Sequence, residues 1–260
     1  MLGAIAGDII GSPFEHRRAE RRDFPLFGPR SEFTDDTVLT VAVAVAITDA
    51  KERGLSKPLY GEFILSFARR FPHAGYGARF RDWMRAERPR PYNSWGNGSA
   101  MRVSPIGFAF DSVGEVLDQA AWSAEVTHDH PAGIAGAQAV ALAVYLARTG
   151  ATKATIKNEI TTRFGYDLDR RVDDIREVYL FDVSCQGSVP EAIIAFLEGS
   201  DCEDAVRNAV WLGGDADTQA CIAGAIAEAY FGGVPARVAG EVYTRIPDDF
   251  AQVVGTLNQP

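Results

Sequence analysis

Cysteine and positive charge are both scarce in this chain of 260 residues, and each shortage narrows what the protein can be. The three cysteines, Cys185, Cys202 and Cys221, are an odd number without C-x-x-C spacing. They fit neither a disulfide framework nor a zinc site, so a reducing, cytoplasmic setting is expected. The 26 basic residues are outnumbered by 35 acidic ones, for a net charge of −9. This acidic balance argues against unaided binding to nucleic acid, whose phosphates need a basic surface.

Long uncharged runs are also missing. No apolar stretch free of charge is long enough to span a bilayer, so no membrane partner is expected. The apolar start, MLGAIAGDII, lacks a positively charged region and is interrupted by Asp8, so a signal peptide is not predicted. Hydrophobic residues make up 47% and charged residues 23% of the chain, which is typical of a globular protein with a substantial core.

A series of strands joined by hairpin turns is not evident either. The apolar segments are long and rich in alanine and leucine, and proline or aspartate opens several of them while glycine closes them, which is typical of helices. Helices are expected within residues 37–54, 131–150, 188–200, 201–214, 216–233 and 235–247. In the fourth, Asp201 is the expected N-cap. Loops are expected at residues 89–98 and 182–188. The sequence therefore predicts an all-α fold, as one compact domain over residues 1–260.

Two of these helices begin with more acid than a helix start requires. FTDDT contains Asp35 and Asp36, and GGDADT contains Asp215 and Asp217. A single aspartate at such a place is normally an N-cap, and negative charge suits that end of the helix dipole. One cap needs only one acceptor, however, and adjacent carboxylates repel each other. The alternative is that both helix starts converge on divalent cations such as Mg²⁺, Mn²⁺ or Ca²⁺, which prefer oxygen ligands.

Three further segments have both an ordinary and a functional interpretation. GDIIGSPFE, residues 7–15, is either a helix end with a surface turn or part of a site. The run of Gly96, Asn97, Gly98 and Ser99 is either an Asn-Gly turn or a loop whose backbone N–H groups cradle phosphates. THDHP places two histidines before a helix, as metal ligands or as a polar cap.

Taken together, these segments resemble the ADP-ribosylglycohydrolase family, which includes the dinitrogenase reductase-activating glycohydrolases and the eukaryotic ADP-ribosyl-acceptor hydrolases. The matching segments are GDIIGSPFE, FTDDT, GNGSAMRVSPIG, THDHPAGIAGAQAVA and GGDADTQACIAGAIAEAYFG. They occur in the family's order and extend to about Gly232. Each segment alone is a weak signal, but the five in this order are specific.

The resemblance implies an orthogonal helical bundle with two Mg²⁺ or Mn²⁺ ions at the centre of the active site. By motif, the metal ligands are Thr34, Asp35, Asp36, Asp215, Asp217 and Thr218. The two acidic helix starts are then two halves of one binuclear site. Ala216 stands between the second set of ligands, where the family commonly has threonine or serine.

The family also suggests roles for the remaining segments. Glu15 matches an acidic residue implicated in substrate gating or catalysis, and the general base is one of Glu15, Asp35 and Asp36. The loop of Gly96, Asn97, Gly98 and Ser99 matches the segment that holds the diphosphate and ribose. His128 matches a position that contacts substrate.

The activity implied is hydrolysis of the glycosidic bond between ADP-ribose and an acceptor, on a protein or a small molecule. One alternative is a helical metal-dependent phosphohydrolase, since His128 and Asp129 form an HD pair. The other histidines, His16, His73 and His130, form no persuasive second motif for it. A second alternative is a regulatory protein that binds ADP-ribose without cleaving it, against which the full set of acidic residues argues.

Overall fold

The structure is a computed structural model that describes residues 1–257, and it confirms the all-α prediction. The helices are α1 (Leu2–Gly11), α2 (Asp35–Arg53), α3 (Tyr60–Arg70), α4 (Ala78–Arg85), α5 (Gly98–Met101), α6 (Ser104–Ala109), α7 (Val113–Glu125), α8 (Pro131–Arg148), α9 (Lys153–Phe164), α10 (Val172–Val178), α11 (Cys185–Glu198), α12 (Cys202–Leu212), α13 (Ala216–Phe231), α14 (Ala236–Tyr243) and α15 (Asp248–Leu257), with a short 3₁₀ turn, η1 (Ser12–Phe14). Over residues 1–257 the only β pairing is an isolated antiparallel bridge between Gly96 and Ser184. None of the described helices combines the length and apolar character needed to cross a bilayer.

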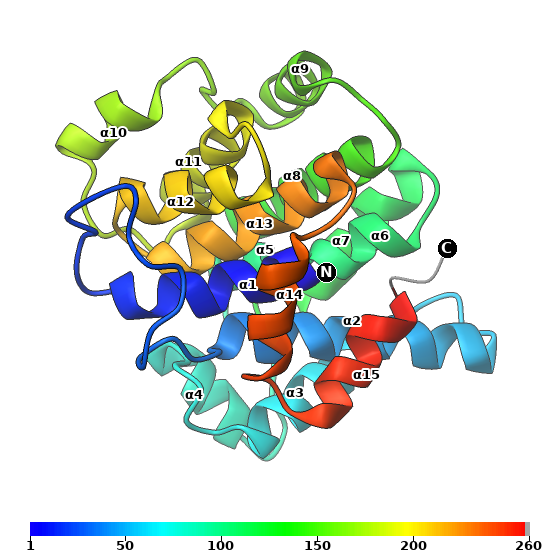
Figure 1. Ribbon diagram of the computed structural model, residues 1–260. Helices are drawn as coiled ribbons and strands as arrows, with labels where there is room; N and C mark the ends of the chain where they lie inside the picture. Colours follow the sequence, from blue (N-terminus) through cyan, green and yellow to red (C-terminus); the bar gives the residue numbers. More distant parts are fainter. Residues whose placement is uncertain (258–260) are drawn as a thin grey trace.

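Helices α1 and α13 lie side by side at the centre of the molecule (Figure 1). Glycine makes this close approach possible. A Cβ atom added to Gly7 would lie 2.0 Å from the backbone oxygen of Ala220, and one added to Gly3 would lie 2.2 Å from that of Gly224. Because glycine has no Cβ atom, the two backbones can come into contact at these positions. The start of α13 is thereby held against the C-terminal half of α1.

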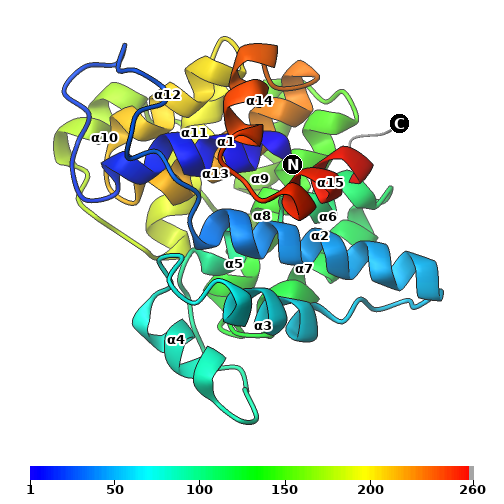
Figure 2. The ribbon, with the colours of Figure 1, turned by 60° about the horizontal axis from the view of Figure 1, so that its bottom comes forward.

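Helix α2 passes beside this central pair and is buried along most of its length (Figure 2). It ends at Gly54, whose φ of 65° gives the left-handed C-cap predicted by the Lys/Arg-then-Gly pattern. At its other end, the Asp35–Asp36 pair lies next to α1. The beginnings of α2 and α13 therefore meet near the C-terminal half of α1.

Most predicted helix limits hold, and one is wrong. Asp201 caps α12 by accepting a hydrogen bond from the backbone N–H of Asp204, as predicted. The helix expected within residues 188–200 begins at Cys185 instead, and Pro190 lies inside it and not in its first turn. Ser184 is the true N-cap, because its side chain accepts from the N–H of Gly187 at 3.0 Å. The predicted loop at residues 182–188 is shorter for the same reason.

Candidate active site

The structure brings the two acidic helix starts together. Asp36, in the first turn of α2, and Asp217, in the first turn of α13, are both buried. An oxygen of each lies within 4.8 Å of the other and of a carboxylate oxygen of Asp8. Asp217 belongs as well to a second such group, with Glu15 and Asp215. Two groups of three carboxylates thus share one residue. Asp35 belongs to neither group, although its side chain lines the same cavity.

Helix capping does not explain these carboxylates. Thr34 is the N-cap of α2, and its hydroxyl accepts from the backbone N–H of Asp36 at 3.4 Å. Asp215 occupies the N-cap position of α13, but its side chain makes no capping hydrogen bond. The acidic side chains at both helix starts are therefore free to face one another.

Asp8 is part of the cluster although the sequence did not identify it as a site residue. Its carboxylate accepts hydrogen bonds from the backbone N–H of Thr34 at 2.9 Å and from that of Thr37 at 3.0 Å. The hydroxyl groups of both threonines also donate to it. Asp8 therefore fixes the start of α2 to α1. A lone charge within the apolar helix LGAIAGDIIG was the signal that could have revealed it.

Asp36 links the two motifs directly. Its Oδ2 accepts a hydrogen bond from the hydroxyl of Thr218 at 3.3 Å, whereas its Oδ1 is buried and has no hydrogen-bond partner. A buried, unpartnered carboxylate oxygen is costly unless a cation compensates it. This oxygen therefore fits a metal ligand.

The electrostatics of the cluster lead to the same conclusion. Burial, followed by the charges of neighbouring carboxylates, raises the pKa of Asp35, Asp36 and Asp217 well above the usual value for aspartate. Burial also raises the pKa of half-buried Glu15. Within residues 1–257, no lysine or arginine forms an ion pair with the buried aspartates of the cluster. An all-oxygen site of this kind suits a hard divalent cation.

Apart from Asp8, which is fully buried, the carboxylates of the cluster line a cavity of about 350 Å³. Gly96, Asn97 and Gly98 line this cavity. The side-chain amide of Asn97 donates to Asp215 at 2.6 Å, so this loop is tied to the carboxylates. Ser99 is fully buried and its hydroxyl donates to the backbone oxygen of Gly133 at 2.7 Å. The hydroxyl of Ser99 thus anchors the loop to α8.

The two histidines before α8 have different surroundings. His130 caps α8, because its Nδ1 accepts from the backbone N–H of Ala132 at 3.1 Å. His128 is buried and lines the cavity. Neither belongs to the two carboxylate groups. The capping interpretation is therefore correct for His130, and neither member of the HD pair, His128 and Asp129, belongs to the cluster.

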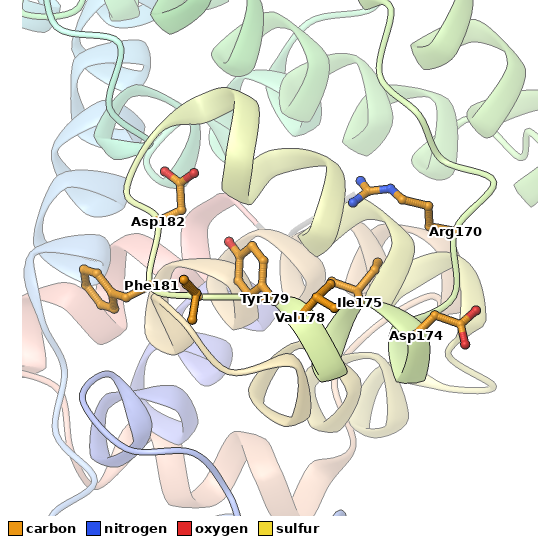
Figure 3. Close-up of a pocket in the computed structure, with 8 residues that line it drawn as sticks. Arg170, Asp174, Ile175, Val178, Tyr179, Phe181 and Asp182 are labelled. Atoms are coloured by element: carbon orange, nitrogen blue, oxygen red, sulfur yellow. The ribbon is translucent and has the colours of Figure 1, made fainter.

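A second hollow of about 420 Å³ lies beside the segment that joins α10 to α11 (Figure 3). Val178, Tyr179 and Phe181 are arranged along it, with Asp174 and Asp182 at opposite ends. These two carboxylates are far apart and Asp174 is exposed. This hollow therefore lacks the convergent acidic groups that line the cavity beside the acidic cluster. The chemistry is therefore assigned to the cavity that holds the buried cluster.

Comparison with known proteins agrees with this geometry. The family model for ADP-ribosylglycohydrolase matches residues 1–259. An uncharacterized protein of Archaeoglobus fulgidus is 31% identical, over 91% of this chain and 88% of its own length. Human ADP-ribosylhydrolase ARH3 is 28% identical, over 89% of this chain and 84% of its own length. A solved structure described as an ADP-ribosylglycohydrolase-related protein complex has the same fold, with a TM-score of 0.69 at 24% identity, covering 99% of this chain and 97% of that one.

Proposed function

The chain belongs to the ADP-ribosylglycohydrolase family, and from this premise we propose that it is a binuclear-metal-dependent hydrolase that cleaves the bond between ADP-ribose and an acceptor. The acceptor is a protein side chain or a small molecule. The whole chain is proposed to act as a single domain. The observation that carries the proposal is the pair of three-carboxylate groups that share Asp217, a residue that lines the cavity.

The proposed metal ligands are taken from the family motifs, and the clustering of carboxylate oxygens supports three of them, Asp36, Asp215 and Asp217. The ligands are Thr34, Asp35, Asp36, Asp215, Asp217 and Thr218, with Asp8 orienting Thr34 from behind. Two Mg²⁺ or Mn²⁺ ions bound there would neutralise the carboxylates, orient ribose hydroxyl groups and lower the pKa of a water molecule.

The reaction breaks the bond between the anomeric carbon of the distal ribose and the acceptor atom. A water oxygen bonds to that carbon and keeps one proton, while the other proton passes through a base to the departing acceptor. Positive charge develops on the sugar in the transition state, as in other glycoside hydrolyses. Acidic side chains that line the cavity and are not neutralised by the metal ions would stabilise this charge.

The candidates for the base are Glu15, Asp35 and Asp36, and their positions differ. Asp36 lies within a three-carboxylate group, and its burial leaves it the least accessible. Glu15 is half-buried at the edge of the cavity, where it could also protonate the departing acceptor. Raised pKa values suit such proton transfers. Single-turnover assays of Glu15→Gln would test Glu15 as the base, because Glu15 is not a proposed ligand and its loss should slow bond cleavage while leaving metal affinity intact. Unchanged cleavage in Glu15→Gln would leave Asp35 and Asp36, whose substitution should also weaken metal binding.

The loop of Gly96, Asn97, Gly98 and Ser99 is proposed to hold the diphosphate and ribose, with His128 contacting the same ligand. Support comes from the position of the loop on the cavity wall and from its bond to Asp215. Glycine at positions 96 and 98 allows a ligand to approach the backbone closely.

The test is release of free ADP-ribose from a panel of ADP-ribosylated substrates, measured with Mg²⁺, with Mn²⁺ and with EDTA. Release from one linkage that requires metal is the expected result, and it would also identify the acceptor. Binding of ADP-ribose without release from any linkage would replace the hydrolase with the regulatory binding protein. Release of inorganic phosphate instead would indicate a phosphohydrolase.

A further inference from the structure

A buried chain of hydrogen bonds ends on the imidazole of His128. Arg102, at the end of α5, donates from Nη2 to the backbone oxygen of Ser123 at 2.7 Å and to the hydroxyl of Thr127 at 3.0 Å. The hydroxyl of Thr127 lies 2.6 Å from Nδ1 of His128. Arg102, Ser123 and Thr127 are completely buried. Because Thr127 is fully buried, solvent does not compete for its hydroxyl group.

The direction of each hydrogen bond follows from the chemistry of the donors. A guanidinium group can only donate, so the hydroxyl oxygen of Thr127 accepts from Arg102. The hydroxyl proton then needs an acceptor of its own. Among the described residues, the only other hydrogen-bond partner of this hydroxyl is Nδ1 of His128. If Nδ1 were the donor instead, the Thr127 proton would be buried without an acceptor, at a cost comparable to a lost hydrogen bond. Nδ1 of His128 therefore accepts.

We propose that Thr127 and Arg102 are positioning residues that fix His128 as the neutral tautomer with its proton on Nε2, so that Nε2–H is a hydrogen-bond donor to an anionic oxygen of the substrate. A neutral imidazole carries one proton, and an accepting Nδ1 leaves that proton on Nε2. The role of His128 is then to bind and orient, and not to transfer a proton. This inference rests on the proposed function for the identity of its ligand.

The electrostatic surroundings agree with this assignment. Burial, together with the charges of Arg102 and Arg79, lowers the pKa of His128 well below its usual value, so the ring stays neutral. Burial lowers the pKa of Arg102 to about 10, which still leaves it charged at neutral pH. The charge of Arg102 polarises the Thr127 hydroxyl, and this strengthens the hydrogen bond to Nδ1. The charge of Arg102 thus makes the electrostatic potential at Nε2 more positive, although the imidazole itself stays neutral.

The free end of the imidazole faces the loop proposed to hold the diphosphate. A Cβ atom built on Gly98 would lie 3.3 Å from Nε2 of His128, and one built on Gly96 would lie 3.6 Å from it. His128, Gly96 and Gly98 line the same cavity. A ligand oxygen placed against this loop would therefore meet the Nε2–H group. Phosphate oxygens fit this donor best, since a hydrogen bond to a charged acceptor is the stronger kind.

The tautomer can be measured directly in the intact, ligand-free protein by NMR with ¹⁵N-labelled histidine. Protonated and unprotonated ring nitrogens give well-separated signals, and His128→Gln assigns the resonance. The expected result is an unprotonated Nδ1 and a protonated Nε2 across neutral pH. A His128 with its proton on Nδ1, or one that is positively charged at neutral pH, would overturn the inference.

The matched variants are Thr127→Val, which removes the hydroxyl but keeps the branched shape, and Thr127→Ser, which keeps the hydroxyl. We expect Thr127→Val to allow the Nδ1–H tautomer to appear and to weaken ADP-ribose binding roughly 10-fold by calorimetry. Thr127→Ser should retain the parental spectrum and affinity. If Thr127 had a purely structural role, the tautomer of His128 would be unchanged in Thr127→Val. That result would disprove the proposal that Thr127 and Arg102 fix the tautomer. Thermal unfolding would confirm that both variants are folded.

The two readouts separate this inference from the proposed function. If ADP-ribose fails to bind the parental protein while the NMR signature is as expected, the proposed ligand is wrong and the fixed tautomer stands. If ADP-ribose binds and is released from substrates, but Thr127→Val keeps both the tautomer and the affinity, then the positioning role of Thr127 and Arg102 is wrong. The proposed hydrolase function would be unaffected by that result.

Discussion

The hydroxyl of Thr218, on α13, donates a hydrogen bond to Asp36, on α2, over 3.3 Å and a sequence separation of 182 residues. Each residue lies in the first turn of its helix. This contact joins the two acidic motifs into one site, with the unpartnered Oδ1 of Asp36 among the neighbouring carboxylates. Because an oxygen held in this way has no protein donor, its natural partner is a cation.

Asp217→Asn should weaken divalent metal binding and lower turnover by about 100-fold or more, because Asp217 belongs to both carboxylate groups. Asp36→Asn should have a similar effect. Mn²⁺ titration calorimetry and ADP-ribose release would measure the two consequences. The matched control is Asp118→Asn, an exposed aspartate on α7 that should leave both unchanged. Normal metal-dependent activity in Asp217→Asn would rule out the binuclear site.

Asp8→Asn should reduce metal affinity by roughly 10- to 100-fold without removing a ligand, since residues that orient ligands commonly have effects of this size. The amide would turn an N–H₂ group towards donors from Thr34 and Thr37, which now face a carboxylate. The start of α2 would then shift relative to α13. Mn²⁺ affinity measured by EPR is the readout, and an unchanged affinity would show that Asp8 does not position the ligands.

The metal-free protein should lose stability as the pH rises from about 4, the unfolded pKa of aspartate, through about 6, the folded pKa of Asp8. Burial raises the pKa of Asp8 to about 6 and that of Asp36 and Asp217 well above the usual value. A carboxyl group whose pKa is higher in the folded than in the unfolded state stabilises the fold while it is protonated. That contribution is complete below the unfolded pKa of about 4 and is lost as the pH passes through the folded value, at roughly 1.4 kcal/mol per pKa unit.

Calorimetric Tm values measured in EDTA should therefore decrease as the pH rises over this interval. Excess Mg²⁺ should restore stability at the higher pH. A metal-free Tm that rises over the same interval would contradict the raised pKa values of the cluster.

Ser99→Ala should raise KM with little change in kcat, because it loosens the loop that is proposed to bind substrate. The hydroxyl of Ser99 donates to the backbone oxygen of Gly133, so its loss affects the wall of the cavity and not the carboxylates. Steady-state kinetics with the substrate identified in the release assay would test this. A fall in kcat alone would mean that the loop acts on bond cleavage and not on binding.

Much of the fold follows from local signals in the sequence. Apolar length, together with caps such as Asp201 and the C-terminal Gly54, predicted α12 and α2 because capping depends on residues a few positions apart. Pro190 led to a wrong helix start because it, too, is only a local signal. It resembles a helix start, whereas the side chain of Ser184 caps the helix six residues earlier.

The sequence by itself predicted six of the described helices, the excess of carboxylate at two helix starts and the family. Only the tertiary structure decided which oxygens meet. Asp8 enters the cluster because Gly7 lets α1 touch α13, and the tautomer of His128 depends on Arg102 through Thr127. Local propensity acts over one or two turns of a helix, whereas these contacts join residues far apart in the chain. They exist only once the helices pack and exclude water, which is also what raises the pKa values and makes a cation necessary.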